Sequence, residues 1–139
     1  MSFIVPWQSD PTANGSVIYR PILDTLLVRT DGQMIRESFL VDSGADNSMG
    51  PRELCDRLGY DWALGTPTIL DGIAGREECQ LQARIHPVDF FIREAGYRLT
   101  ILVCFAEGDA PLLLGRDGFF DAFRVQFDKP QLQTVFELV

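Results

Sequence analysis

The 139-residue chain has few of the side chains from which metal sites and nucleophilic triads are built. His86 is its only histidine, so a site with several histidine ligands is excluded, and a serine-type triad would have to use this residue. The three cysteines, Cys55, Cys79 and Cys104, are far apart and include no CxxC pair, which argues against a structural zinc site. We therefore expect buried, reduced thiols and neither a metal nor another cofactor.

Signals for membranes, nucleotides and nucleic acids are missing as well. No apolar run approaches the roughly 20 residues that a membrane span needs, and residues 1–9 lack the pattern of a signal peptide. Neither GxGxxG nor GxxxxGK, the glycine-rich phosphate-binding patterns, occurs. The net charge of −8 argues against nucleic acid and against anionic membrane surfaces. These observations predict a cytoplasmic protein with no nucleic-acid partner and no membrane partner.

The hydrophobic pattern is mostly that of β-strands. Residues 79–85 alternate between apolar and polar side chains, the period of a half-buried strand. Asp31-Gly32 is a hairpin signal, and Pro51 and Gly59 suit the start and the end of a short helix. The predicted strands are 17–19, 22–30, 34–41, 66–70, 79–85, 87–92, 99–105, 111–114, 123–127 and 134–138, and the predicted helical segments are 51–58 and 116–123.

The chain divides into a short arm and one domain. Residues 1–16 contain Pro6, Pro11, Gly15 and several small polar residues, which predict an extended or mobile N-terminal arm. Residues 17–139 have the length of one domain, without repeat or linker, and the apolar content of 46% is ordinary for a globular protein.

An aspartate, Asp42, stands at the end of an apolar strand. Residues 39–41 are continuously apolar, which predicts burial on both faces just before this carboxylate. Such an acid is costly unless it is paired or hydrogen-bonded. Ser43 offers a hydroxyl, and Gly44 lets the backbone approach closely. Asp-Ser-Gly turns are common in proteins, so this motif alone is a weak indication of a catalytic site and needs the support of a second motif.

The second motif lies downstream, at residues 111–117. Together with residues 39–46 it resembles the active-site frame of the retropepsin family, the retroviral-type aspartic proteases and their cellular relatives. In that family the catalytic turn is backed by a strand that ends in two apolar residues and a glycine, followed by a short helix. Residues 113–115, Leu-Leu-Gly, fit this pattern.

A pair of complementary charges strengthens the resemblance. In the retroviral enzymes the residue two positions after the catalytic glycine is acidic and pairs with an arginine directly after the second glycine. Asp46 and Arg116 occupy these positions. We expect them to form a partly buried ion pair that joins the two motifs.

The resemblance implies a mostly β, closed barrel-like retropepsin fold with one or two short helices over residues 17–139. It implies a homodimer, since the chemistry needs two aspartates and the chain supplies the motif once. A loop between two strands, residues 72–75, would be the flap that closes over the substrate. The implied roles are catalysis for Asp42, Ser43 and Gly44, substrate binding for Ala45, Asp46, Gly72, Ile73, Ala74 and Gly75, and support of the site for Leu114, Gly115 and Arg116.

The function implied is that of an aspartic endopeptidase, which cleaves a peptide or protein substrate with a water activated between two Asp42 carboxylates. Two alternatives stay open. One is a non-catalytic module that keeps the retropepsin fold for dimerisation or peptide binding. The other is a monomeric small-ligand β-barrel, which would leave Asp42 as an unpaired buried acid. The intact Asp-Ser-Gly-Ala sequence favours the enzyme.

Overall fold

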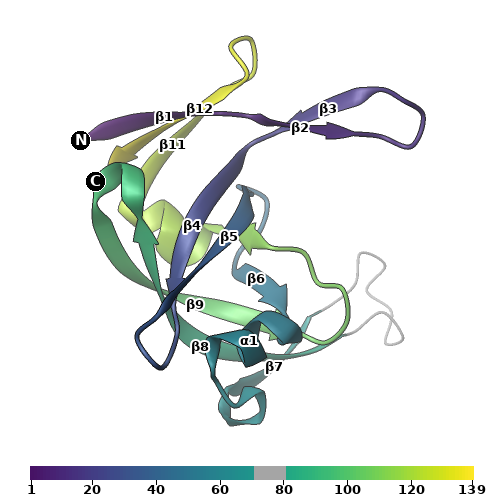
Figure 1. Cartoon of the computed structure of the whole chain (residues 1–139), viewed down its shortest axis with the longest axis vertical. Coiled ribbons are helices and arrows are strands. Elements are labelled where there is room, and N and C mark those ends of the chain that lie inside the picture. The colour runs from purple at the N-terminus through teal and green to yellow at the C-terminus, as the bar shows by residue number, and fades with distance from the viewer. Residues whose placement is uncertain (71–80) are drawn as a thin grey trace.

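The computed structural model describes residues 1–70 and 81–139, in which strands dominate (Figure 1). The strands are β1 (Ser2–Pro6), β2 (Gln8–Pro11), β3 (Val17–Arg20), β4 (Ile22–Val28), β5 (Met34–Val41), β6 (Ser48–Pro51), β7 (Thr66–Leu70), β8 (Leu81–Ile92), β9 (Tyr97–Ala106), β10 (Leu113–Leu114), β11 (Phe123–Asp128) and β12 (Gln133–Leu138). The helical segments are α1 (Arg52–Leu58), the single turns η1 (Trp62–Leu64) and η3 (Arg93–Ala95), and η4 (Arg116–Phe120). Within the described ranges, no helix is long and apolar enough to cross a membrane.

Six strands close a barrel in the order β4-β5-β10-β6-β9-β8, because β4 pairs with β8 as well as with β5. The first half of β8 pairs with β7 instead, so β7 extends the sheet beyond the barrel. Two neighbours, β5–β10 and β6–β9, are parallel and join segments that are far apart in the sequence. The predicted mostly β, barrel-like fold with short helices is confirmed.

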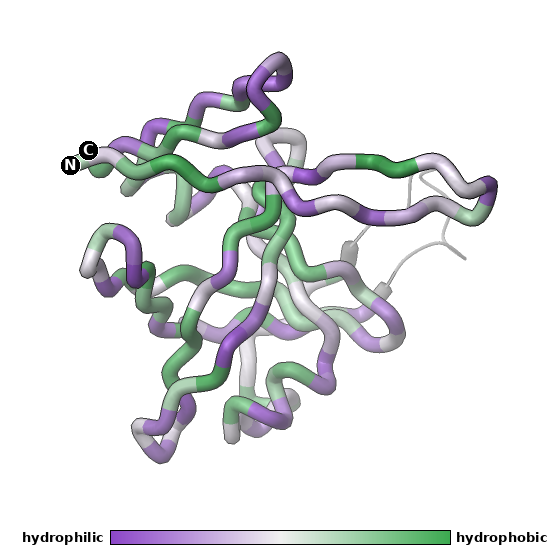
Figure 2. Tube along the Cα trace, turned by 45° about the horizontal axis from the view of Figure 1, so that its top comes forward, coloured by the Kyte–Doolittle hydropathy of each residue, from purple (hydrophilic) through white to green (hydrophobic). Residues whose placement is uncertain are grey.

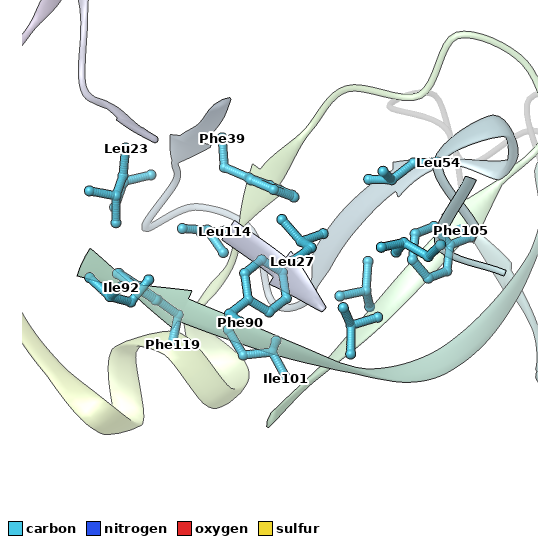
Figure 3. Packing of buried hydrophobic residues seen from close by; sticks show 14 of the residues in the cluster. Leu23, Leu27, Phe39, Leu54, Phe90, Ile92, Ile101, Phe105, Leu114 and Phe119 are labelled. Atoms are coloured by element: carbon cyan, nitrogen blue, oxygen red, sulfur yellow. The ribbon is translucent and has the colours of Figure 1, made fainter. Parts of the chain in front are cut away.

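Large apolar side chains fill the barrel (Figure 3). On β4 every second residue is buried, which points Leu23 and Leu27 into the core. Phe39 of β5 meets Phe90 of β8 edge to face, with ring centroids 5.4 Å apart. The strand that leads to Asp42 is therefore held by close packing on its inner side.

A second sheet brings the two ends of the chain together. β1 pairs antiparallel with β12, which pairs with β11 in a terminal hairpin. Phe3 stacks on Phe136 at 5.0 Å, and Phe119 stacks on Phe123 at 5.1 Å, which ties this sheet to η4. Part of the segment 1–16 is thus a paired strand, whereas the division of the chain at residue 16 stays a prediction.

The short helix follows the sequence signals. Pro51 precedes α1 with extended dihedrals, and Gly59 follows it in the left-handed region with a φ of 90°. A Cβ atom at Gly59 would lie 2.2 Å from the Oγ1 atom of Thr30, so space as well as conformation requires glycine here.

Some predicted elements differ from the structure. Residues 116–123 are not a continuous helix, because Asp117 (ψ 122°) and Gly118 (φ 90°) break η4, and β11 already begins at Phe123. The strands predicted at 79–85 and 87–92 are one strand over the described residues, since β8 continues through Pro87. Pro87 lies where β8 has only β9 as a neighbour, a place where a strand tolerates a residue without an N–H group.

Candidate active site

The backbone at Asp42 is held from two sides. Its N–H group donates a hydrogen bond to the carbonyl oxygen of Leu114 at 3.0 Å. The preceding residue, Val41, donates to the carbonyl oxygen of Pro21 at 2.9 Å. Asp42 thus emerges between the start of β4 and the end of β10, at a position that the barrel defines.

The side chain of Asp42 is oriented by its own turn. The N–H group of Gly44 donates to Oδ1 of Asp42 at 2.8 Å, and that of Ala45 donates to the Asp42 carbonyl oxygen at 3.3 Å. Asp42 is half-buried, whereas Ser43 and Gly44 are exposed. The turn therefore positions the carboxylate while leaving it accessible at the surface of this chain.

The segment behind the turn approaches so closely that it requires glycine. β10 runs parallel to β5 with Leu114 opposite Val41, and the N–H group of Gly115 donates to the buried Oγ of Ser48 at 3.0 Å. A Cβ atom at Gly115 would lie 2.5 Å from both the carbonyl carbon and the carbonyl oxygen of Asn47. Gly115, which the sequence predicts to support the site, therefore lies directly against the backbone of Asn47, with no space for a side chain between them.

The two residues after Gly115 also form backbone hydrogen bonds to the Asp42 turn. Arg116 donates through its N–H group to the carbonyl oxygen of Ala45, and Asp117 donates to that of Asp46, each at 2.9 Å. The guanidinium of Arg116 also forms an ion pair with the Asp46 carboxylate. The ion pair expected from the sequence is present, and it links the two motifs.

The expectation that this ion pair is partly buried is wrong for the single chain. The exposed fractions are 53% for the Arg116 side chain and 76% for that of Asp46. Water screens an exposed pair, so its charges add little to stability. The backbone bonds and the close approach at Gly115 hold the turn instead.

We therefore expect Arg116→Ala to change the free energy of unfolding by only about 0–1 kcal/mol. The matched control is Arg124→Ala, because Arg124 forms a comparably exposed pair with Glu137. Urea denaturation of both variants checks this expectation. A loss of about 3–5 kcal/mol in Arg116→Ala alone would show that the pair is desolvated in the working protein.

The structure brings most of the predicted site residues together. Asp42, Ser43, Gly44, Ala45 and Asp46 form one turn, and Leu114, Gly115 and Arg116 lie directly against it. The residues predicted as the flap, Gly72, Ile73, Ala74 and Gly75, lie outside the described part of the chain. The functional roles of all these residues stay predictions.

Three contributors to this arrangement have no signal in the sequence: the hydroxyl of Ser48, the carbonyl oxygen of Pro21 and the backbone of Asn47. Ser48 is separated by 67 residues from its partner Gly115. A contact of this kind exists only once β6 and β10 lie side by side.

A small pocket lies beside the turn. It has a volume of about 180 Å³ and is lined by Asn47, Asp117 and Gly118 together with Thr100 and Leu102 of β9. Its wall combines a carboxylate, an amide and a hydroxyl with one apolar side chain.

Other nucleophiles in the described part of the chain are poorly placed for chemistry. Cys55 and Cys104 are buried and free, as expected, and Cys79 lies outside the described residues. Burial raises the pKa of the Cys55 thiol to about 11 and also raises the pKa of Cys104, so both stay protonated at neutral pH. His86 is buried with its Nε2 atom 3.1 Å from the carbonyl oxygen of Trp62.

Two solved structures have a fold similar to that of this chain. The chain is similar to a retropepsin-like aspartic protease from Rickettsia conorii, with a TM-score of 0.62 and 18% sequence identity over 98% of this chain and 89% of that one. It is also similar to the EIAV protease complexed with the inhibitor HBY-793, with a TM-score of 0.52 and 23% identity over 70% of this chain and 82% of that one. The chain has the retropepsin fold.

In this fold the motifs at residues 39–46 and 111–117 lie together although they are distant in the sequence, because β5 and β10, which carry them, are parallel neighbours. Comparison with protein-family models gives no match, and comparison with curated proteins gives none either. The shared retropepsin fold is therefore what connects this chain to aspartic proteases, and the homodimer stays a prediction.

Proposed function

We propose that the chain is an aspartic endopeptidase whose active site forms between two copies. The observation that carries the proposal is the Asp42 turn, which is braced by β10 and has its carboxylate oriented by the N–H group of Gly44. The turn leaves the half-buried Asp42 carboxylate accessible at the surface of the chain, so a second copy can bring its own Asp42 beside it.

The proposed chemistry follows from two carboxylates at close range. Two like charges so near each other cannot both be ionised, so the pair of Asp42 side chains shares one proton. The ionised carboxylate takes a proton from a water molecule, whose oxygen attacks the scissile carbonyl carbon. The protonated carboxyl gives its proton to the carbonyl oxygen. In the second step the carboxyl that took the proton from water gives it to the departing amine nitrogen, the other carboxylate takes a proton from a diol hydroxyl, and the C–N bond breaks.

The neighbours of Asp42 have supporting roles in this proposal. Gly44 holds one carboxylate oxygen in each copy, and the Ser43 hydroxyl joins the two turns across the symmetry axis. Ala45 and Asp46 bind the substrate backbone because they lie on the same turn. Leu114, Gly115 and Arg116 support the turn from behind.

We also propose a cytoplasmic location. Cys55 and Cys104 are free and buried, as expected of a protein in a reducing compartment. Neither thiol has a role in the proposed reaction.

The test is to combine sedimentation with peptide cleavage. We expect the purified protein to sediment as a dimer at micromolar concentration and to cut peptides from a random library, as read by mass spectrometry. Specific activity is expected to fall on dilution, since a monomer holds only one carboxylate. A statine-type transition-state mimic is expected to bind the dimer.

Two results would contradict this proposal. A stable monomer with full activity would exclude an active site shared between copies. A dimer that binds peptides without cutting them would instead support the non-catalytic module.

A further inference from the structure

The hairpin formed by β2 and β3 has no packing partner within the described part of its own chain. It projects from the barrel as a separate two-stranded ribbon (Figures 1 and 2). Every residue of both strands is exposed. An isolated two-stranded hairpin is at best marginally stable in water. We therefore expect this exposed hairpin to bind a partner in the functional protein.

The hairpin is nevertheless well ordered by its own bonds. Thr12 donates through its N–H group to the carbonyl oxygen of Ser16 at 2.8 Å, and the Asn14 side chain accepts from the Ser16 N–H group at 3.1 Å. Arg20 forms an ion pair with Asp10 at 3.0 Å across the two strands. The hairpin, residues 8–20 and called the arm below, is thus closed by bonds of its own at the turn and across the two strands.

The arm carries consecutive exposed apolar side chains on β3. Val17, Ile18 and Tyr19 are 52%, 42% and 44% exposed. Because neighbouring residues of a strand point to opposite faces, both faces of the arm present apolar surface. Figure 2 shows the hydrophobic stretch in one strand of the projecting ribbon.

Both ends of the arm are anchored. On the β2 side, Trp7 donates through its N–H group to the carbonyl oxygen of Leu132 at 2.8 Å and through Nε1 to Oγ1 of Thr134 at 2.8 Å. On the β3 side, the carbonyl oxygen of Pro21 accepts from Val41, the residue before Asp42. The arm therefore leaves the barrel beside the strand end that carries the catalytic turn, in a direction set by the fold.

A recess separates the arm from the barrel. It has a volume of about 260 Å³ and is lined by Gln8, Ser9, Asp10, Arg20, Ile22 and Ser38. Gln8 reaches across it to Oδ1 of Asp24 on β4 at 3.3 Å. The surface between arm and barrel is therefore concave and can receive part of another chain.

We propose that the β2–β3 hairpin is a dimerisation arm that grips a second copy of this chain. The inference rests on the proposed function, because a second Asp42 beside the first brings the partner to the end of β5, where the arm begins. By two-fold symmetry the partner's arm reaches back, so both arms and both recesses are covered at once. The arm acts on assembly and takes no part in the chemical step.

The first test removes the arm. Gln8 and Arg20 lie opposite each other in the β2–β3 pair, so Asn-Gly in place of residues 9–19 joins them by a two-residue turn. We expect the dissociation constant of the dimer, measured by sedimentation equilibrium, to rise by about tenfold or more. At protein concentrations that restore the dimer, the cleavage rate per dimer is expected to equal that of the unaltered protein.

A single substitution tests the same proposal even if the shortened chain does not fold. Ile18→Asp changes a side chain that is exposed in the protomer, so folding is retained and the same weakening of the dimer is expected. Leu64→Asp is the matched control, since Leu64 is 82% exposed on η1, outside the arm.

The outcomes separate the two proposals. An unaltered protein that dimerises and cleaves, with the same dissociation constant in Ile18→Asp and Leu64→Asp, would overturn the arm and leave the endopeptidase standing. An unaltered protein that neither dimerises nor cleaves would overturn the proposed function and the arm with it. Weakening in Ile18→Asp but not in Leu64→Asp supports the arm.

Discussion

Asp42→Asn is expected to abolish peptide cleavage while leaving the chain folded and dimeric. Asparagine has nearly the same shape as aspartate, and its side-chain oxygen can still accept the hydrogen bond from the Gly44 N–H group. In the proposed mechanism, the substitution removes the group that takes a proton from water and returns it to the leaving amine. Since general acid–base catalysis alone contributes about 10²–10⁴-fold, and both of its partners are lost, we expect a fall of about 10⁴-fold or more.

The matched control is Asp109→Asn. Asp109 is an exposed aspartate in the connection between β9 and β10, and its replacement is expected to leave cleavage unchanged. Circular dichroism and sedimentation of both variants establish that they are folded and dimeric. Undiminished cleavage by Asp42→Asn would remove Asp42 from the reaction and with it the proposed mechanism.

Gly115→Ala is expected to be the most damaging small substitution near the site. Its Cβ atom would lie 2.5 Å from two backbone atoms of Asn47 and 2.9 Å from the carbonyl oxygen of Ala45. To make room for this Cβ atom, residues 45–47 would have to move away from β10, which would strain the hydrogen bonds that Arg116 and Asp117 donate. We expect a loss of about 3 kcal/mol or more in the free energy of unfolding, together with a large loss of cleavage at full occupancy of the dimer.

Gly96→Ala is the control for this substitution. Gly96 has a φ of 57°, and a Cβ atom added there would meet no described atom within 4 Å, so only backbone strain of about 1 kcal/mol is expected. Urea denaturation measures both variants under the same conditions. Equal losses would mean that the segment 45–47 shifts at little cost and that β10 does not brace the turn.

Local chemistry in the sequence was sufficient to predict several elements. Asp31-Gly32 marks the β4–β5 hairpin, where Gly32 has a φ of 87°. Pro51 and Gly59 delimit α1, because proline suits the approach to a helix and glycine the left-handed residue after it. These predictions succeeded because each depends on the conformational preferences of a few adjacent residues.

The resemblance at residues 39–46 and 111–117 predicted the retropepsin fold, and residues 42–46 and 114–116 do meet. Two predictions about the surroundings of these motifs were wrong. The Asp46–Arg116 pair is exposed, and residues 116–123 are broken by the dihedrals of Asp117 and Gly118. Neither the exposure of a charge nor a break next to a packed strand is encoded in residue spacing.

By itself, the sequence determined most of the strands, the β4–β5 hairpin, the limits of α1 and the acid at the end of an apolar strand, because period and turn preference act over a few residues. Only the tertiary structure decided that β10 lies parallel to β5, that Gly115 has no room for a side chain, and that the β2–β3 hairpin stands clear of the barrel. These features depend on contacts between segments many residues apart. Such contacts form only when the whole barrel closes around its core.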